Sequence, residues 1–267
     1  MIYYQHDFRL ELVSQTAQDP QWLFFPGGPG LGAEYLRAFA QQLKLPGSVY
    51  LIDFPKDGTN TAGELSLDSW GNGLIALLKT FTAPIIVAHS FSAMYLLLLS
   101  AIEPLLQGLV LMNTTVSNSF FEHVARMQQR HNLPDLAPAA MQYHLNPKLE
   151  TYKIFWETYK HYCYTPAELT LGEEMMHHFA YNSLAYYFAI EHIYPNYHSR
   201  WVPQQVLTMT IASEHDFICP PNAFIENEEF TGAHIINKLI LQAGHCPWLL
   251  HQEQVTACFA EFITRLN

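Results

Sequence analysis

Ile85-Ile86-Val87-Ala88-His89-Ser90-Phe91-Ser92 is the stretch of sequence from which the fold can be inferred. Residues 85–88 form an apolar run that predicts a buried strand, and a helical pattern follows at once over residues 92–102. A serine in a tight turn between a strand and a helix needs small residues two positions before and after it, and Ala88 and Ser92 are both small. We therefore predict that Ser90 is a nucleophile and that the Phe91 N–H is an oxyanion donor. The alternative is that Ser90 only caps the helix.

The segments around this stretch alternate between strands and helices. Apolar runs that end at glycine or proline predict the strands, and apolar residues at helical spacing predict the helices between them. The expected strands are residues 22–25, 48–54 and 108–112, and the expected helices are residues 33–44 and 68–81, the second with Asp68 as its N-cap. This order predicts an α/β fold with a mostly parallel sheet and helices on both faces.

The pattern changes in the middle of the chain. Residues 116–201 are rich in Tyr, His, Phe, Met and Glu, and they indicate several helices without a buried strand between them. Alternation resumes with expected strands at residues 206–212 and 235–241 and a closing helix at residues 248–266. We therefore predict a core domain made of residues 1–115 and 202–267, interrupted by a helical insertion at residues 116–201.

Two loops in the last part of the chain contain a candidate base and a candidate acid. A serine nucleophile needs a base, and His245 follows an expected strand in Ala243-Gly244-His245-Cys246. Asp216 follows the preceding expected strand and would orient the imidazole through its second N–H, with Glu214 as the rival acid. Asn113 occupies another position where an acid would be possible, and it has no carboxylate. The alternatives are a surface histidine and a turn-forming aspartate.

The glycine-rich loop Phe25-Pro26-Gly27-Gly28-Pro29-Gly30 follows an expected strand upstream of Ser90. Glycine lets a backbone N–H approach a substrate closely. We expect the Gly28 N–H to be the second oxyanion donor, beside that of Phe91.

These motifs together resemble the α/β-hydrolase superfamily, and more narrowly its proline iminopeptidase branch. Pro26-Gly27-Gly28-Pro29-Gly30 is similar to the H-G-G-P-G of that branch with Pro26 in place of the histidine, and the loop around His245 is similar to its histidine loop. The insertion falls where the family has its helical cap. The elbow departs from the branch because it reads A-H-S-F-S instead of G-G-S-W-G.

The resemblance also implies two residues that bind the substrate. Members of the branch hold the free α-amino group of a peptide with glutamates from the cap. Phe155-Trp156-Glu157 and the segment around Glu191 resemble the parts of the cap that carry them, so the resemblance implies Glu157 and Glu191 in this role. The alternative is that both glutamates lie on solvated helix faces.

The composition narrows the classes of partner and cofactor. The chain of 267 residues has a formal net charge of −11 and no basic stripe, which argues against a nucleic-acid partner. Its four cysteines form no C-x-x-C pair and no signal peptide is evident, so we expect reduced thiols and a cytoplasmic location. No apolar run is long enough for a membrane span, and no motif for a metal or a cofactor is evident.

The sequence thus predicts a serine hydrolase that forms an acyl-enzyme on a small-molecule or short-peptide substrate, without a cofactor. An aminopeptidase of the proline iminopeptidase type is the first expectation, and a carboxylesterase or another small-acyl hydrolase is the alternative. A non-catalytic binding protein on the same fold is the second alternative. The sequence leaves the oligomeric state open.

Overall fold

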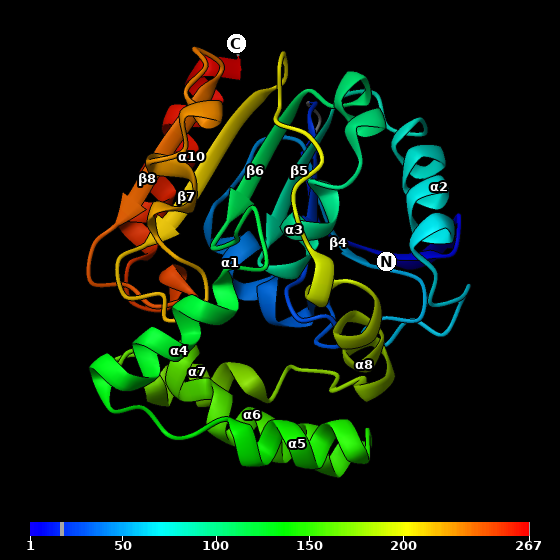
Figure 1. Cartoon of the computed structure of the whole chain (residues 1–267). Coiled ribbons are helices and arrows are strands. Elements are labelled where there is room, and N and C mark those ends of the chain that lie inside the picture. The colour runs from blue at the N-terminus through cyan, green and yellow to red at the C-terminus, as the bar shows by residue number, and fades with distance from the viewer. Residues whose placement is uncertain (17–18, 267) are drawn as a thin grey trace.

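A computed structural model describes residues 1–16 and 19–266, and its centre is a single eight-stranded sheet (Figure 1). The strand order is β1-β2-β4-β3-β5-β6-β7-β8. The strands are β1 (Ile2–Gln5), β2 (Phe8–Gln15), β3 (Gln21–Phe25), β4 (Ser48–Asp53), β5 (Pro84–His89), β6 (Gly108–Met112), β7 (Leu207–Ser213) and β8 (Ile235–Ile240).

Six of the strands run parallel. β1 pairs with β2 and β2 with β4 in antiparallel fashion, whereas the pairs from β4 through β8 are all parallel. The register places Ala88 beside Phe25 on one side and beside Leu111 on the other. The carboxyl ends of β3, β5 and β6 therefore lie at one edge of the sheet, where the loops that follow them meet.

Helices cover both faces of the sheet, because successive side chains of each strand point to opposite faces. Trp22 and Phe24 pack under α1 (Arg37–Gln42) and α10 (Gln252–Leu266). Leu23 and Phe25 belong to the core on the other face. That face is covered by α2 (Leu67–Leu78), α3 (Phe91–Leu96) and α9 (Asn222–Ile225), and short 3-10 helices occur at Ala33–Leu36, Ser100–Leu105, Glu228–Phe230 and Pro247–Leu249.

A group of helices between β6 and β7 lies across the carboxyl ends of the strands, at the bottom of Figure 1. We call this group the cap. Its helices are α4 (Phe120–His131), α5 (Ala137–Leu145), α6 (Leu149–Cys163), α7 (Leu169–Met176) and α8 (Ser183–His192), and a 3-10 helix follows at Tyr194–Asn196.

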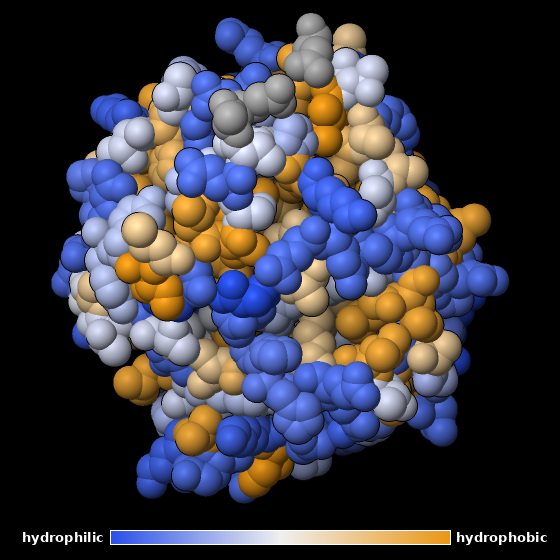
Figure 2. All heavy atoms as spheres, turned by 180° about the vertical axis from the view of Figure 1, so that it is seen from behind, coloured by the Kyte–Doolittle hydropathy of each residue, from blue (hydrophilic) through white to orange (hydrophobic). Residues whose placement is uncertain are grey.

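From behind, the surface is hydrophilic over most of its area and carries several separate hydrophobic clusters (Figure 2). Within residues 1–16 and 19–266, no helix combines the length and the apolar character that crossing a membrane requires.

The predicted parallel sheet with helices on both faces is observed, and so is a run of helices between β6 and β7. The sequence did not indicate the antiparallel hairpin of β1 and β2, in which Phe8 and Leu10 are buried. The N-cap expected at Asp68 was wrong, because the Ser66 side chain accepts the hydrogen bond from the Ser69 N–H at the start of α2.

Candidate active site

Ser90 stands in the turn between β5 and α3. Its backbone has φ of 54° and ψ of −116°, a strained conformation for a residue with a side chain. The turn is held by hydrogen bonds from the Ser90 N–H to the Met112 carbonyl oxygen (2.8 Å) and from the Thr114 hydroxyl to the Ser90 carbonyl oxygen (2.9 Å). The Ser90 side chain makes no cap hydrogen bond to α3, so the helix-cap alternative does not explain this serine.

The small residues on either side of Ser90 suit this turn. Ala88 and Ser92 are completely buried. The Ser92 hydroxyl lies 3.1 Å from the Phe25 carbonyl oxygen and donates to it, which ties the start of α3 to the end of β3. A serine can therefore stand where the usual motif has glycine, because its hydroxyl is satisfied in the core.

The glycine-rich loop packs directly against Ser90. A Cβ at Gly27 would lie 3.0 Å from the Ser90 Cβ, so only glycine fits there without a shift. The Gly28 carbonyl oxygen accepts a 2.6 Å hydrogen bond from the Tyr194 hydroxyl of the cap. Within the part of the chain that the structure describes, the N–H groups of Gly28 and Phe91 donate to no acceptor, and both residues lie beside Ser90. They are available to bind an oxyanion.

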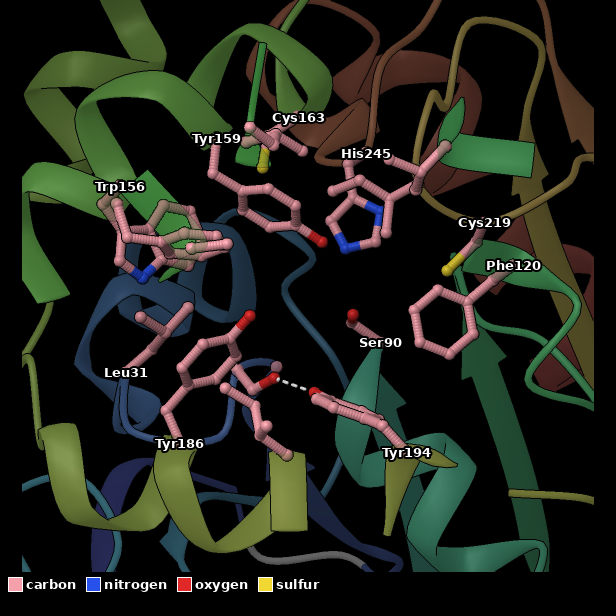
Figure 3. A pocket seen from close by; sticks show the side chains of 18 of the residues that line it. Leu31, Ser90, Phe120, Trp156, Tyr159, Cys163, Tyr186, Tyr194, Cys219 and His245 are labelled. Atoms are coloured by element: carbon pink, nitrogen blue, oxygen red, sulfur yellow. Dashed lines mark hydrogen bonds between the residues drawn. The ribbon is translucent and has the colours of Figure 1, made fainter. Parts of the chain in front are cut away.

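Asp216 and His245 form a buried hydrogen-bonded pair. His245 Nδ1 lies 2.8 Å from Asp216 Oδ2, and the exposed fractions of the two residues are 2% for Asp216 and 6% for His245. Since Nδ1 is engaged by the carboxylate, Nε2 is the ring nitrogen that is available to Ser90. Figure 3 shows the Ser90 hydroxyl and the His245 ring facing the same cavity.

Several donors hold Asp216 in its ionised form. Burial by itself would raise the pKa of Asp216, but the neighbouring His245 and hydrogen bonds from Cys219 N–H and the Asn113 side chain outweigh burial and lower it. Asn113, which stands at the other possible acid position, therefore supports Asp216. The rival Glu214 has a side chain 45% exposed, and its carboxylate accepts from the Gln242 N–H instead.

The cavity above Ser90 has a volume of about 580 Å³ and is enclosed largely by the cap. Aromatic side chains dominate its wall, with Trp156, Tyr159 and Tyr186 among them (Figure 3). Among the described residues that line it there is no Asp, Glu, Lys or Arg.

The two cap glutamates implied by the resemblance lie outside this cavity. The Glu157 carboxylate is 2.7 Å from Lys160 Nζ, and its side chain is 65% exposed. The Glu191 carboxylate is 3.7 Å from His144 Nδ1, and its side chain is 39% exposed. The structure thus brings Ser90, Asp216 and His245 to one place and leaves Glu157 and Glu191 on the surface of the cap.

The sequence analysis missed a pair of side chains that joins three loops of the site. The Tyr35 hydroxyl accepts from the Gly27 N–H (2.6 Å) and lies 2.7 Å from His89 Nδ1. His89 Nε2 lies 3.0 Å from the His245 carbonyl oxygen. Burial lowers the pKa of His89 to about 3, with a further effect from His245, so the ring is neutral and accepts from Tyr35 through Nδ1 while it donates through Nε2.

We predict that Tyr35→Phe lowers the free energy of unfolding by about 1–3 kcal/mol, because it leaves the buried Gly27 N–H and His89 Nδ1 without partners. Urea unfolding of the variant and the wild type measures this difference. Tyr4→Phe is the matched control, since Tyr4 is 54% exposed and its variant should change stability by less than about 0.5 kcal/mol. An equal effect of the two substitutions would show that the Tyr35 hydroxyl contributes nothing.

The cap holds the loop that carries His245. The His245 N–H donates to the Cys163 carbonyl oxygen at the end of α6 (2.7 Å). The fully buried carboxylate of Glu168 accepts from the Gly244 N–H at 3.1 Å to each oxygen and from the Thr165 N–H at 2.9 Å. A side chain at Gly244 would collide with that carboxylate, since its Cβ would lie 2.5 Å away.

The buried carboxyl group of Asp57, which lies near that of Asp53, binds the backbone of the glycine-rich loop. Asp57 Oδ1 accepts 2.6 Å hydrogen bonds from the Gly30 and Gly58 N–H groups, while Oδ2 has no partner within the described residues. Burial raises the pKa of Asp57 to about 7, and the nearby Asp53 contributes to the rise. Between the ordinary pKa of an aspartate and about pH 7, the folded protein therefore holds a proton on Asp57 that the unfolded chain has lost.

We predict that this proton makes the protein less stable as the pH rises. The unfolded chain binds fewer protons than the folded chain between the ordinary pKa of an aspartate and the raised pKa of Asp57, so stability falls over that interval. From about pH 5 to about pH 8 the wild type should lose roughly 1–3 kcal/mol more unfolding free energy than Asp57→Asn, which keeps an acceptor for Gly30. Urea unfolding across this range tests the prediction, and parallel pH profiles would contradict it.

One group of side chains has the composition of a metal site. Asp216, Cys219 and His245 each place a possible ligand atom within 4.8 Å of the others. Burial raises the pKa of the Cys219 thiol well above its usual range, and Asp216 adds to the rise, so the thiol is protonated and is a poor ligand. The His245 Nδ1 and the Asp216 carboxylate already bond each other, which favours the hydrogen-bonded pair over a metal.

Comparison with known proteins identifies the family. A model of the Alpha/beta hydrolase family matches residues 22–257, which is most of the chain. The chain therefore belongs to the alpha/beta hydrolase family. A search of curated proteins finds no match.

Solved structures of this fold are similar over nearly the whole chain. A proline iminopeptidase-related protein from Thermus thermophilus is 19% identical with a TM-score of 0.71, and the match covers 97% of this chain and 94% of that one. An α/β hydrolase from a Medee basin deep-sea metagenome is 16% identical with a TM-score of 0.72, covering 99% and 97%. A thermophilic esterase from Thermogutta terrifontis is 14% identical with a TM-score of 0.67, covering 97% and 94%. At these identities the likeness shows the fold alone, and the predicted α/β-hydrolase fold is confirmed.

Proposed function

We propose that the chain is a serine hydrolase that cleaves carboxylic esters through an acyl-enzyme on Ser90. The observation that carries this proposal is the buried Asp216–His245 hydrogen bond of 2.8 Å at the cavity that Ser90 faces. The two free N–H groups of Gly28 and Phe91 beside the same serine support it as well. Serine, base, acid and oxyanion donors are the parts that acyl transfer requires.

In the first half of the reaction, Ser90 Oγ attacks the carbonyl carbon of the ester while His245 Nε2 takes the hydroxyl proton. The C=O π electrons move to the carbonyl oxygen, and the Gly28 and Phe91 N–H groups stabilise the resulting oxyanion. Asp216 stabilises the imidazolium and remains ionised. When the carbonyl re-forms, the bond to the alcohol breaks, and the alcohol leaves with the proton from His245.

In the second half, a water molecule attacks the acyl-enzyme while His245 Nε2 takes one of its protons. The same two N–H groups stabilise the second oxyanion. The bond between the acyl carbon and Ser90 Oγ then breaks, the proton returns from His245 to Ser90, and the acid leaves. Every proton is accounted for without a cofactor.

The wall of the cavity favours an uncharged ester over a peptide with a free α-amino group. Burying an ammonium ion is costly unless a counter-charge accompanies it. The described residues that line the cavity provide no carboxylate, and Glu157 and Glu191 interact with Lys160 and His144 instead. This is the reason to prefer the esterase over the aminopeptidase of the proline iminopeptidase type.

We predict that a fluorophosphonate probe labels the wild type at one site, and that Ser90→Ala abolishes the labelling. His245→Gln and Asp216→Asn should slow the reaction of Ser90 with the probe by roughly 10⁴-fold or more, as the loss of the base or the acid does in other serine hydrolases. Gel fluorescence and mass spectrometry of the labelled peptide measure this. Ser117→Ala is the control that should keep full labelling, because Ser117 lies on the surface. A folded wild type without any label would instead favour the non-catalytic binding protein.

We predict that a neutral para-nitrophenyl ester is a far better substrate than a prolyl arylamide with a free amino group. Part of that difference is the greater intrinsic reactivity of the ester, so the charge is tested within the arylamides, where acetylation of the amino group should raise kcat/KM by about 10-fold or more because the free ammonium finds no counter-charge in the cavity. The N-acetylated arylamide is the matched control that removes the charge and keeps the leaving group. Greater activity on the free arylamide, with a selective loss in Glu157→Gln or Glu191→Gln, would restore the aminopeptidase assignment.

A further inference from the structure

Three tyrosines that line the cavity, Tyr159, Tyr164 and Tyr186, have no hydrogen-bond partner for their hydroxyls within the described residues, and Tyr159 and Tyr186 are the two that Figure 3 shows near Ser90 and His245. The hydroxyls of Tyr35, Tyr152 and Tyr194 are each engaged by the glycine-rich loop or by His89. Tyr159 of α6 and Tyr186 of α8 also line the cavity, and within the described residues their hydroxyls have no hydrogen-bond partner. Figure 3 shows both hydroxyls directed into the cavity, toward the space beside Ser90 and His245.

Ring packing fixes the two side chains. The Tyr159 ring stacks on Phe155 at 5.0 Å between centroids, and Trp156 meets it edge-on at 5.3 Å. The Tyr186 ring stacks on Tyr152 at 4.9 Å. Both hydroxyls are therefore positioned before a ligand binds, so little rotamer entropy would be lost on binding.

Burial makes both phenols neutral donors. It raises the pKa of Tyr159 and of Tyr186 above the usual range of a phenol, and the neighbouring tyrosines add to the rise. Both residues are half-buried and their hydroxyls face the cavity, so a ligand oxygen can accept from them in place of water.

We propose that Tyr159 and Tyr186 form a subsite for a neutral oxygen acceptor on the acyl chain of the substrate. The inference rests on the ester hydrolysis proposed for Ser90 and narrows the substrate class to hydrophobic esters whose acyl chain carries a second oxygen, such as a ketone or an ether. The remainder of the chain would contact the aromatic wall, and the volume of about 580 Å³ is in the range of cavities that bind small organic ligands.

The order of the two half-reactions assigns the acyl chain, and not the alcohol, to the cavity under the cap. In the acyl-enzyme the acyl group stays bound to Ser90, whereas the alcohol must leave and water must enter before the second step. The acyl group, which is retained, can therefore occupy an enclosed cavity. The alcohol needs a route to solvent.

The experiment uses a panel of para-nitrophenyl esters of straight-chain acids, each compared with keto esters of equal chain length in which the ketone is moved stepwise along the chain. The measured quantity is the ratio of kcat/KM for a keto ester to that for its plain counterpart. The wild-type ratio is divided by that of each variant, which cancels the effect of the ketone on intrinsic reactivity.

At the favoured ketone position, Tyr159→Phe and Tyr186→Phe should each lower this ratio by about 3- to 10-fold. The double variant should lower it at least as much as the stronger single variant, and not by the product of the two, because both hydroxyls share one acceptor. Tyr187→Phe is the matched control, because Tyr187 is on the same helix and does not line the cavity, and its ratio should equal the wild-type ratio. If the double variant fails to fold, the two single variants decide.

Ratios that are unchanged in both single variants at every ketone position would overturn the subsite. A clear preference for a choline ester over all neutral esters would also overturn it, because the aromatic wall would then act as a cation site. Failure of the proposed function gives a different result, in which no ester is hydrolysed and the fluorophosphonate probe does not label Ser90.

Discussion

The candidate site depends on the parallel pairing of β5 with β3 on one side and with β6 on the other. This pairing brings the ends of three strands to one edge, and the hydrogen bond from the Ser90 N–H to the Met112 carbonyl oxygen continues it into the turn. The strained backbone of Ser90 persists because hydrogen bonds to its N–H and to its carbonyl oxygen hold the turn on both sides. The close packing of Gly27 on Ser90 then places the glycine-rich loop beside the serine.

The elements that the sequence predicted well are those whose local pattern agrees with their environment. The strands β3 to β7 are mostly buried runs bounded by turn residues, while the edge strand β8 is only partly buried, and the bounds of all six were predicted to within about two residues. Ser90, Asp216 and His245 could be chosen because each follows a strand of the parallel sheet, and such loops must meet at one edge. The β1–β2 hairpin was missed because the prediction rested on unbroken apolar runs, whereas in Phe8-Arg9-Leu10-Glu11 apolar and charged residues alternate, which is typical of a half-buried strand.

The rest of the site depends on contacts between residues far apart in the chain. Tyr35 and His89, which share a hydrogen bond, are 54 positions apart in the sequence, and Glu168 and Gly244 are 76 apart. No local sequence pattern indicates either hydrogen bond. The face that a cap helix presents to the cavity is equally non-local. Glu157 and Tyr159 are two positions apart on α6, yet the first binds Lys160 at the surface and the second lines the cavity. The orientation of α6 decides this difference, and the sequence near Glu157 does not contain it.

The hold of the cap on the His245 loop limits how new specificities can arise on this scaffold. Because Cys163 and Glu168 hold the loop that carries the imidazole, an insertion without equivalent acceptors would displace the group that takes the serine proton in the proposed reaction. In the proposed enzyme, the segment that encloses the substrate cavity therefore also holds the proton-transferring histidine in place. Evolution of this protein toward other substrates would have to proceed by single replacements in the cavity wall, with the segment from Cys163 to Glu168 left intact.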